Sequence, residues 1–389
     1  MTDTIPDRID LAAIGGGVIG LAAAFGAARA GMRVAVIERA AIGGGASSVA
    51  AGMLSPALEI EDCPPPLMNF AIESLARYPA FLAEMAEVSD ADCGFRNEGS
   101  LWLALDRDDR LLLEHLHAVQ RQGGIDTALL SPADAKRREP NISPRVIGAL
   151  IAPDDRQIDP RKFALALADC IRALGGTVVE HAGDVRVMPE RGGFAATWPG
   201  GRIEPINVLI AAGCHTNDLL PSGVAKLPLR PVKGQTIRLR GPAVIDHVVR
   251  TLRVYLVPRA DGEIVVGATM EEQGFDSRAT VWAVQDLLAE ARRAVPAVDE
   301  LAVAELPVGF RPALRDNLPA IGAYGPPGLY VATGHYRHGI LLAPATADLM
   351  LTLLTGESDD RTDFDPNRFA RDRDRAERRA HESRSRAAG

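Results

Sequence analysis

Apolar and polar positions follow a recognisable order at the start of the chain. Residues 9–14 form a largely apolar run of strand length, and the alanine-rich stretch after residue 20 predicts a helix. Between them lies the glycine turn Gly15-Gly16-Gly17-Val18-Ile19-Gly20, and a second strand is predicted over residues 33–37, ending at Glu38. Strand, glycine turn, helix and strand in this order are typical of a unit that binds a dinucleotide.

Each glycine of this turn has its own predicted role. Gly15 permits the tight turn, Gly17 lets the backbone approach phosphates, and Gly20 lets the helix lie close to the sheet. Bare backbone N–H groups and the positive end of the helix dipole then form a cradle for a pyrophosphate. Glu38 follows Gly20 by eighteen residues, where its carboxylate can accept hydrogen bonds from ribose hydroxyls. This favours FAD or NAD over NADP.

Two simpler interpretations compete with a dinucleotide site. A glycine turn also arises as plain helix packing, but strand, turn, helix, strand and acid in order favour the binding unit. Residues 11–28 carry no charge and are about as long as a membrane span. Three consecutive glycines in the first third of that stretch argue against a span, because glycine is a weak helix former.

A second run of small residues, 42–53, follows Glu38. Glycine and serine also suit a flexible surface loop. The sequence Ser-Ser-Val-Ala-Ala-Gly-Met leads into apolar residues, however, whereas a linker in solvent is more often polar. This pattern favours a second contact with the cofactor.

Helical and strand patterns alternate along the rest of the chain. Helices are predicted over residues 65–88, 106–122, 159–174 and 280–294, and residues 334–340 open a further helix that runs to about residue 354. Strands are predicted over 100–105, 177–180, 183–187, 207–213, 235–239, 254–258, 263–268 and 329–333. Residues 260–262 predict a hairpin, and the β pattern between 228 and 270 indicates a separate antiparallel sheet. The tail from residue 368 predicts a solvated helix or a disordered end.

Composition narrows the classes of function. The chain has 389 residues, enough for two domains, and its net charge of −8 gives no support to nucleic acid as a partner. The four cysteines (Cys63, Cys93, Cys170 and Cys214) include no C-x-x-C pair, so neither a disulfide scaffold nor a zinc site is indicated. No signal peptide is recognisable at the N-terminus, which predicts a cytoplasmic protein that does not act at a membrane.

Together these motifs resemble the D-amino-acid oxidase family of FAD-dependent amine oxidoreductases. The resemblance covers residues 9 to about 355 and is most specific in the Gly15–Glu38 unit and in residues 47–54, 254–259, 266–270, 309–312 and 334–344. It implies an α/β fold in which a Rossmann-like FAD-binding domain of mixed sheet and helices joins an α+β substrate domain with an antiparallel sheet. The FAD-binding domain is expected over residues 1–85, 150–220 and 308–365, the substrate domain over 86–149 and 221–307, and a charged tail over 366–389.

The cofactor site follows from the glycine turn, the strand ends and this resemblance. The candidate FAD contacts are Gly15, Gly17, Val18, Ile19, Gly20, Glu38, Arg39, Ala46, Ser47, Ala51, Gly52, Met53, Val185, Gly213, His335, Tyr336, Arg337, His338, Gly339, Ile340 and Leu341. Residues 335–341 are expected around the isoalloxazine, where a glycine-flanked turn presents N–H groups to an electron-rich ring edge, although a simple helix cap has the same pattern. Members of the family that bind flavin covalently use a histidine soon after the first βαβ unit or a cysteine near the C-terminal motif. No histidine lies in residues 41–53 and no cysteine follows Cys214, so the resemblance implies non-covalent FAD.

The substrate site is likewise implied by the resemblance. Arg311 would pair with a substrate carboxylate, and Tyr255 and Arg337 would add hydrogen bonds to it. A planar guanidinium matches a carboxylate in bidentate geometry, and a phenol is a neutral donor. With 39 arginines in the chain, a structural role for either arginine is the competing interpretation.

The activity implied is oxidation of glycine, sarcosine or small D-amino acids by hydride transfer to FAD. The imine would hydrolyse to glyoxylate and ammonia, or pass to thiazole synthesis for thiamine, and O2 would be reduced to hydrogen peroxide. A dehydrogenase of the same fold with another electron acceptor, a non-catalytic FAD-stabilised module and a nicotinamide dehydrogenase are the alternatives. The resemblance also implies a homo-oligomer, commonly a tetramer.

Overall fold

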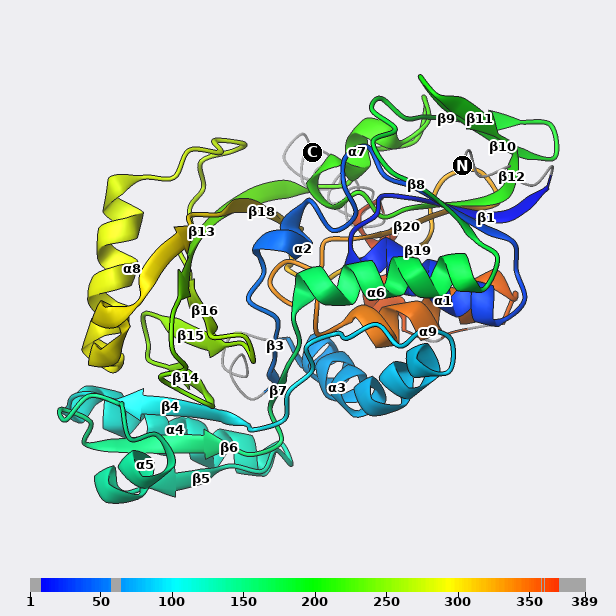
Figure 1. The fold of residues 1–389 in the computed structure, drawn as a ribbon. Helices are drawn as coiled ribbons and strands as arrows, with labels where there is room; N and C mark the ends of the chain where they lie inside the picture. Colours follow the sequence, from blue (N-terminus) through cyan, green and yellow to red (C-terminus); the bar gives the residue numbers. More distant parts are fainter. Residues whose placement is uncertain (1–7, 57–63, 358, 360, 371–389) are drawn as a thin grey trace, which may run out of the picture.

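Two large β-sheets organise the chain and lie on opposite sides of Figure 1. The computed structural model describes residues 8–56, 64–357, 359 and 361–370. The first sheet has the strand order β19-β20-β12-β1-β2-β8, in which β19 is antiparallel and the other strands are parallel. Its strands are β1 (Ile9–Ile14), β2 (Val34–Ile37), β8 (Thr177–Val179), β12 (Pro205–Ile210), β19 (Ala320–Ala323) and β20 (Leu329–Thr333).

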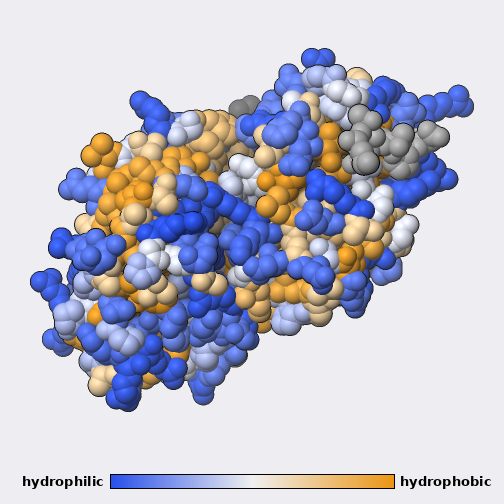
Figure 2. All heavy atoms as spheres, viewed as in Figure 1, coloured by the Kyte–Doolittle hydropathy of each residue, from blue (hydrophilic) through white to orange (hydrophobic). Residues whose placement is uncertain are grey.

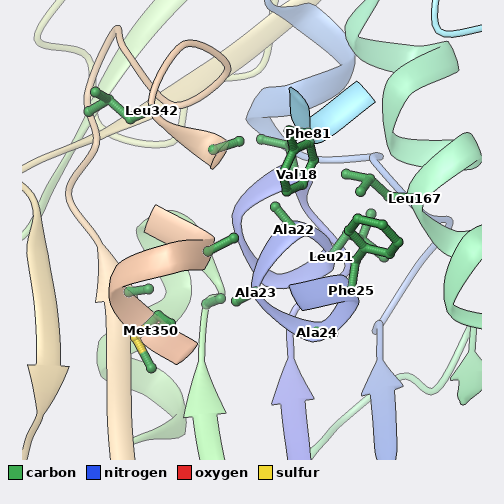
Figure 3. Close-up of a cluster of buried hydrophobic side chains, with 14 of the residues drawn as sticks. Val18, Leu21, Ala22, Ala23, Ala24, Phe25, Phe81, Leu167, Leu342 and Met350 are labelled. Carbon is green, nitrogen blue, oxygen red and sulfur yellow. The ribbon is translucent and has the colours of Figure 1, made fainter. Parts of the chain in front are cut away.

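Four helices lie together on one face of this sheet (Figure 1). They are α1 (Val18–Arg29), α3 (Pro65–Ala86), α6 (Pro160–Ala173) and α9 (Ala343–Leu354). Figure 3 shows α1 at the centre of this layer, with Phe81, Leu167 and Met350 around it. A helix that is apolar on all sides is stable in water only when neighbours cover it, which explains the uncharged stretch at the N-terminus. Among the described residues, no helix has the length and apolarity to cross a membrane.

The second sheet has nine strands and is mainly antiparallel, as predicted, although β14 and β4 pair in parallel. Its strands are β4 (Ser100–Ala104), β5 (Ala128–Leu130), β6 (Gly148–Ala152), β13 (Arg230–Arg240), β14 (Val248–Arg250), β15 (Tyr255–Pro258), β16 (Glu263–Gly267), β17 (Ala302–Glu305) and β18 (Val308–Ala313). Helices α4 (Arg107–Gln122), α5 (Pro132–Arg138) and α8 (Val281–Ala294) pack on it. The predicted hairpin at residues 260–262 joins β15 to β16, with Gly262 in the left-handed region at φ +82°.

Smaller elements complete the described chain. They are α2 (Ala46–Val49), β3 (Met53–Leu54), β7 (Arg156–Gln157), β9 (Arg186–Glu190), β10 (Gly193–Trp198), β11 (Gly201–Ile203), α7 (Thr216–Leu219) and three short 3-10 turns at Gly213–His215, Pro296–Glu300 and Thr362–Phe364. Strands β9, β10 and β11 form an antiparallel sheet, and β3 pairs with β7.

Some differences from the sequence prediction bear on the site. Residues 181–183 donate backbone hydrogen bonds to residues 38–40, so the strand predicted from residue 183 begins instead at Arg186. Residues 335–342 form turns, and α9 begins only at Ala343. Strand β18, which carries Arg311, had not been predicted. The proposed domain boundaries remain a prediction, and Cys63 and most of the tail lie outside the described residues.

Candidate active site

The carboxyl ends of the parallel strands gather most of the predicted cofactor residues at one edge of the six-stranded sheet. The glycine turn follows β1, Glu38 follows β2 and Gly213 follows β12, while residues 334–341 follow β20. Strand β1 lies between β2 and β12. In sheets of this kind, ligands bind outside the carboxyl ends where the strand order reverses.

The glycine turn has the geometry that a phosphate cradle needs. Gly15 has φ +116°, and a Cβ there would lie 2.5 Å from the Ala211 carbonyl oxygen. A Cβ on Gly20 would lie 2.2 Å from the Gly15 carbonyl oxygen, so only glycine fits both positions. At Gly17 the nearest atom to such a Cβ would be Ser47 Oγ at 3.5 Å. The backbone is therefore open at the start of α1, and it fits a pyrophosphate group.

Glu38 and Ser47 contact the same turn. The Glu38 carboxylate accepts hydrogen bonds from the backbone N–H of Gly16 at 2.6 Å and of Ala40 at 2.9 Å. These bonds fix its orientation beside the turn, and each carboxylate oxygen keeps a further lone pair for a ribose hydroxyl. Ser47 Oγ accepts from the Val18 N–H at 3.1 Å, so one N-terminal donor of α1 is already used within the protein.

The other predicted contacts near β2 are close to this edge. Ile19 is in the first turn of α1, and Arg39 is exposed directly after Glu38. Val185 is half-buried in the loop that follows residues 181–183, which bond to residues 38–40. Gly213 lies in a 3-10 turn with φ +55°, and its carbonyl accepts from Thr333 Oγ1 at 3.0 Å.

Three arginines hold the segment Ala46–Met53, which we call the cofactor loop. Arg161 Nε and Arg238 Nη2 donate to the Ser48 carbonyl at 3.0 and 3.1 Å. Arg259 donates to the Ala51 carbonyl and also to the Ile158 carbonyl and to Gln157 Oε1. Burial lowers the pKa of Arg259 to about 10, which still leaves it charged at neutral pH. The cofactor loop is thereby bonded both to α6, which packs on the six-stranded sheet, and to the nine-stranded sheet.

Tight backbone contacts fix the same loop further. Gly52 has φ +78°, and a Cβ there would lie 2.0 Å from the Ile158 carbonyl oxygen. Arg161 of α6 also pairs with Glu305 of β17 at 2.8 Å, which links elements from the two sides of the molecule.

The surface visible in Figure 2 is hydrophilic in the middle, between the two sheets, and apolar residues gather over α8.

The turn at residues 335–341 leaves donors available. Tyr78 and Ser74 of α3 donate to the carbonyls of Ile340 and Leu341. Among the described residues, the backbone N–H groups of Gly339, Ile340 and Leu341 have no hydrogen-bond partner. Unpaired N–H groups in a buried turn suit the electron-rich edge of a ligand ring. His335 is buried beside Thr346, and burial lowers its pKa to about 3, so it is neutral.

The candidate substrate residues lie on one face of the nine-stranded sheet. In the register, Arg311 pairs with Val232 and Gly234 with Gly309, while Gly267 pairs with both Thr236 and Tyr255. Directly paired residues, and alternate residues of a strand, share a face. Val49 of the cofactor loop packs on this face, where a Cβ on Gly309 would lie 2.9 Å from its Cγ2.

The side chains of Arg311 and Tyr255 each pack against the backbone of a glycine. The guanidinium of Arg311 lies on Gly234, where a Cβ would come within 2.5 Å of Nη1. The ring of Tyr255 lies on Gly267, where a Cβ would come within 2.5 Å of its hydroxyl oxygen. Arg311 Nη1 donates to the Thr269 carbonyl at 3.0 Å, two residues beyond Gly267. The two tips therefore lie over neighbouring positions of the sheet.

Arg311 is half-buried and has no acidic partner among the described residues. Its Nη1 donates to the carbonyls of Thr269 and Lys233, which orient a guanidinium without neutralising it. A guanidinium held this way retains donors for an external carboxylate.

Arg337 reaches this neighbourhood from the other sheet. Tyr336 donates its N–H to the Pro312 carbonyl at 2.9 Å, and its hydroxyl contacts Met270 Sδ at 2.9 Å. The exposed guanidinium of Arg337 lies 5.5 Å from the centroid of the Tyr336 ring. The turn after β20 thus lies beside the end of β18, which carries Arg311.

Several residues of this arrangement had not been singled out from the sequence. Thr236 and Arg238 lie in the strand predicted over residues 235–239, and Gly234 directly precedes it. None of the three gave a signal of its own, because only the pairing register places them beside Arg311 and Tyr255. Arg259 belonged to a motif of the resemblance, but its contact with Ala51 depends on the fold.

A glycine turn at the start of a helix, with an acidic side chain beside it at the carboxyl ends of parallel strands, is typical of proteins that bind a dinucleotide. The chain belongs to the DAO family of FAD dependent oxidoreductases, whose pattern matches residues 10–353. It is an FAD-dependent oxidoreductase, as the sequence predicted.

Known proteins similar to the chain agree with this membership. The glycine oxidase of Geobacillus kaustophilus is 32% identical over 351 residues, which cover 89% of this chain and 93% of that protein. Its crystal structure superposes with a TM-score of 0.86 over 92% of this chain and 98% of that one. The bifunctional protein ThiO/ThiG of Synechocystis is 33% identical over 89% of this chain, which spans 51% of that protein. The crystal structure of iminodiacetate oxidase from Chelativorans is 25% identical, with a TM-score of 0.81 over 90% of this chain and 96% of that one.

Proposed function

We propose that this chain oxidises glycine and other small amino acids or N-substituted glycines. The observation that carries the proposal is Arg311, a guanidinium without an acidic partner among the described residues, laid on Gly234 beside Tyr255. Bidentate pairing with Arg311 and a bond from the Tyr255 hydroxyl would hold a substrate carboxylate. The relatives named glycine oxidase support glycine as the first substrate to test.

Bound FAD supplies the two-electron chemistry of such a reaction. The residues proposed to hold it non-covalently are those of the glycine turn, the cofactor loop, Val185, Gly213 and the turn 335–341. The protein's own contribution is to fix the Cα–H of the substrate in one orientation and to exclude water. His335, being neutral, adds no positive charge to this region.

The substrate would lose a hydride and a proton, and the resulting imine would add water to give glyoxylate and ammonia. O2 would take up the two electrons and two protons as hydrogen peroxide. The proposal includes a cytoplasmic location and a homo-oligomeric state. The imine product can also supply thiazole synthesis, as the relatives named ThiO/ThiG suggest.

Purified holoenzyme tests the proposal. Glycine, sarcosine, D-alanine and iminodiacetate are each mixed with it anaerobically, and loss of flavin absorbance is recorded. Bleaching by none of these compounds contradicts the proposal. Bleaching without oxygen uptake or peroxide in air supports the alternative of a dehydrogenase.

Replacing Arg311 tests the site itself. Arg311→Ala is expected to lower kcat/KM for glycine about 10- to 100-fold, because a hydrogen bond to a charged group is removed. FAD content should remain intact. Arg110→Ala is the control, since this exposed arginine pairs with Glu114 on α4. Unchanged kinetics for Arg311→Ala would refute its role.

A further inference from the structure

Thr236 occupies the middle of the face that carries the proposed substrate residues. Gly234, Thr236 and Arg238 alternate along β13 and therefore share this face. Gly234 supports the guanidinium of Arg311, and Arg238 donates to the Ser48 carbonyl of the cofactor loop. Along β13, Thr236 thus lies between the proposed carboxylate anchor and the residue that holds the cofactor loop.

Across the sheet, Thr236 is directly opposite Gly267, which supports the ring of Tyr255. Cβ atoms of directly opposed residues are about 5 Å apart. Thr236 is therefore near the phenol of Tyr255.

The Thr236 hydroxyl is buried without a partner. The residue is 4% exposed, and its Oγ1 has no hydrogen bond to any described residue. Buried polar groups in native proteins are nearly always paired, and an unpaired one lowers stability. Arg238 Nε, two residues further along the same strand, also makes no hydrogen bond, although it lies 4.0 Å from Glu305 Oε2. The unpaired Thr236 hydroxyl indicates that another molecule completes this surface.

Polar side chains just beside this face are fully paired. Gln235 bonds to Glu271 and Thr280 through its side chain. Thr269 Oγ1 accepts from the Gln235 N–H and donates to Glu271. The unpaired hydroxyl is therefore specific to the face that carries Arg311 and Tyr255.

We propose that the Thr236 hydroxyl is a further substrate contact and accepts a hydrogen bond from the substrate's amino group. This assignment rests on the proposed function. The carboxylate has its proposed donors in Arg311 and Tyr255, and the guanidinium of Arg311 has no acceptor to offer an amine. The amino group is one carbon from the carboxylate, and Thr236 is the next polar position along β13 toward the cofactor loop. The site would select a primary or secondary amine next to a carboxylate.

Two ligands separate a contact with the amine from one with the carboxylate. Glycine has both groups, and acetate has only the carboxylate. Wild-type holoenzyme and Thr236→Val are titrated with acetate by the change in flavin spectrum, and with glycine by anaerobic flavin reduction. We expect glycine to bind about fivefold more weakly to Thr236→Val, the effect of one neutral hydrogen bond, with acetate affinity unchanged.

Two further variants control for structural effects. Thr236→Ser should restore glycine affinity because it keeps the hydroxyl. Ile237→Val changes the neighbouring residue, which packs in the apolar layer on the opposite face, and should leave both affinities unchanged. The melting temperature of Thr236→Val should be equal to or above that of wild type, since the lost hydroxyl has no partner in the protein.

Each other outcome contradicts the assignment. Equal weakening of glycine and acetate would mean that the hydroxyl serves the carboxylate or the shape of the pocket. No weakening of either would mean that it contacts no substrate atom. If no small amino acid reduces the flavin of wild type, the proposed function fails and this assignment with it. If wild type is reduced and Thr236→Val is equally reactive, only this assignment fails.

Discussion

At the scale of single residues, the site depends on two glycines as much as on the side chains above them. Arg311 and Tyr255 lie flat on Gly234 and Gly267, and a methyl group at either glycine would overlap them. Both glycines are buried, Gly234 inside β13 and Gly267 as the last residue of β16, and glycine weakens a sheet. Their presence is explained by the close approach of the side chains that we assign to the substrate.

Gly234→Ala tests this explanation. The new Cβ would lie 2.5 Å from Arg311 Nη1 and 2.7 Å from Cζ, so the flexible end of Arg311 must move. We expect KM for glycine to rise about tenfold while the melting temperature changes little, because a side-chain tip yields more easily than backbone. The control is Gly148→Ala in β6 of the same sheet, where the Cβ would meet its nearest atom at 3.5 Å. Equal effects of the two substitutions on KM would contradict the explanation.

The sequence reveals the charged residues of this site better than the residues that support them. Arg311 and Tyr255 stand in segments similar to a known family, so their chemistry could be inferred. Gly234 and Thr236 stand in an ordinary strand pattern, and their neighbours across the sheet depend on register. A shift of one residue would turn them to the opposite face, so sequence periodicity alone could not assign them.

At the scale of elements, the cofactor loop is held in place by buried arginines of the nine-stranded sheet. Arg259, directly after β15, bonds to the carbonyls of Ala51 and Ile158 and to Gln157. Arg238 of β13 bonds to Ser48 and pairs with Glu263. The sheet that would bind substrate thus also positions the loop that would bind FAD.

Arg259→Lys should therefore weaken FAD binding. A lysine keeps the positive charge but cannot reach three acceptors with the fork of a guanidinium. We expect the dissociation constant for FAD to rise about tenfold, measured by flavin fluorescence after dilution of the holoenzyme. Arg240→Lys at the exposed end of β13 is the control. Unchanged FAD affinity in Arg259→Lys would show that the loop holds its position without this arginine.

Elements with a strong hydrophobic periodicity were predicted well, and irregular elements were not. Strand β1, helix α1 and strand β2 follow the pattern closely. Strand β18 contains Gly309 and Pro312, which interrupt the β pattern, and its pairing with β13 compensates for them. The turn 335–342 looked like the start of a helix because its apolar residues continue into α9. Side chains of α3 bind its carbonyls instead, an interaction between segments about 260 residues apart.

At the scale of the whole molecule, a buried carboxyl group ties the cofactor loop's end to the nine-stranded sheet. Asp155 precedes β7 and accepts hydrogen bonds from Ser55, which follows β3, and from Ser100 of β4. It is 3% exposed, and burial raises its pKa from 3.8 to about 6, although the two serines and nearby arginines oppose the shift. Ionisation of Asp155 at the junction of these segments therefore lowers the free energy of unfolding.

The direction of the pH dependence follows from these two values. Between about pH 4 and pH 6 the folded protein retains a proton that the unfolded chain releases, so stability from this group is complete below pH 4 and is lost as pH rises through 6. Asp155→Asn keeps an oxygen that can accept both serine hydroxyls and removes the charge. Relative to wild type, Asp155→Asn should therefore gain up to about 2 to 3 kcal/mol of unfolding free energy between pH 4.5 and pH 7.5. Urea unfolding of FAD-saturated proteins measures it, with Asp154→Asn as an exposed control that also removes one acid. A difference between Asp155→Asn and wild type that is constant with pH would mean that Asp155 is ionised throughout this range, and its two serine bonds would then be those of a stable buried carboxylate.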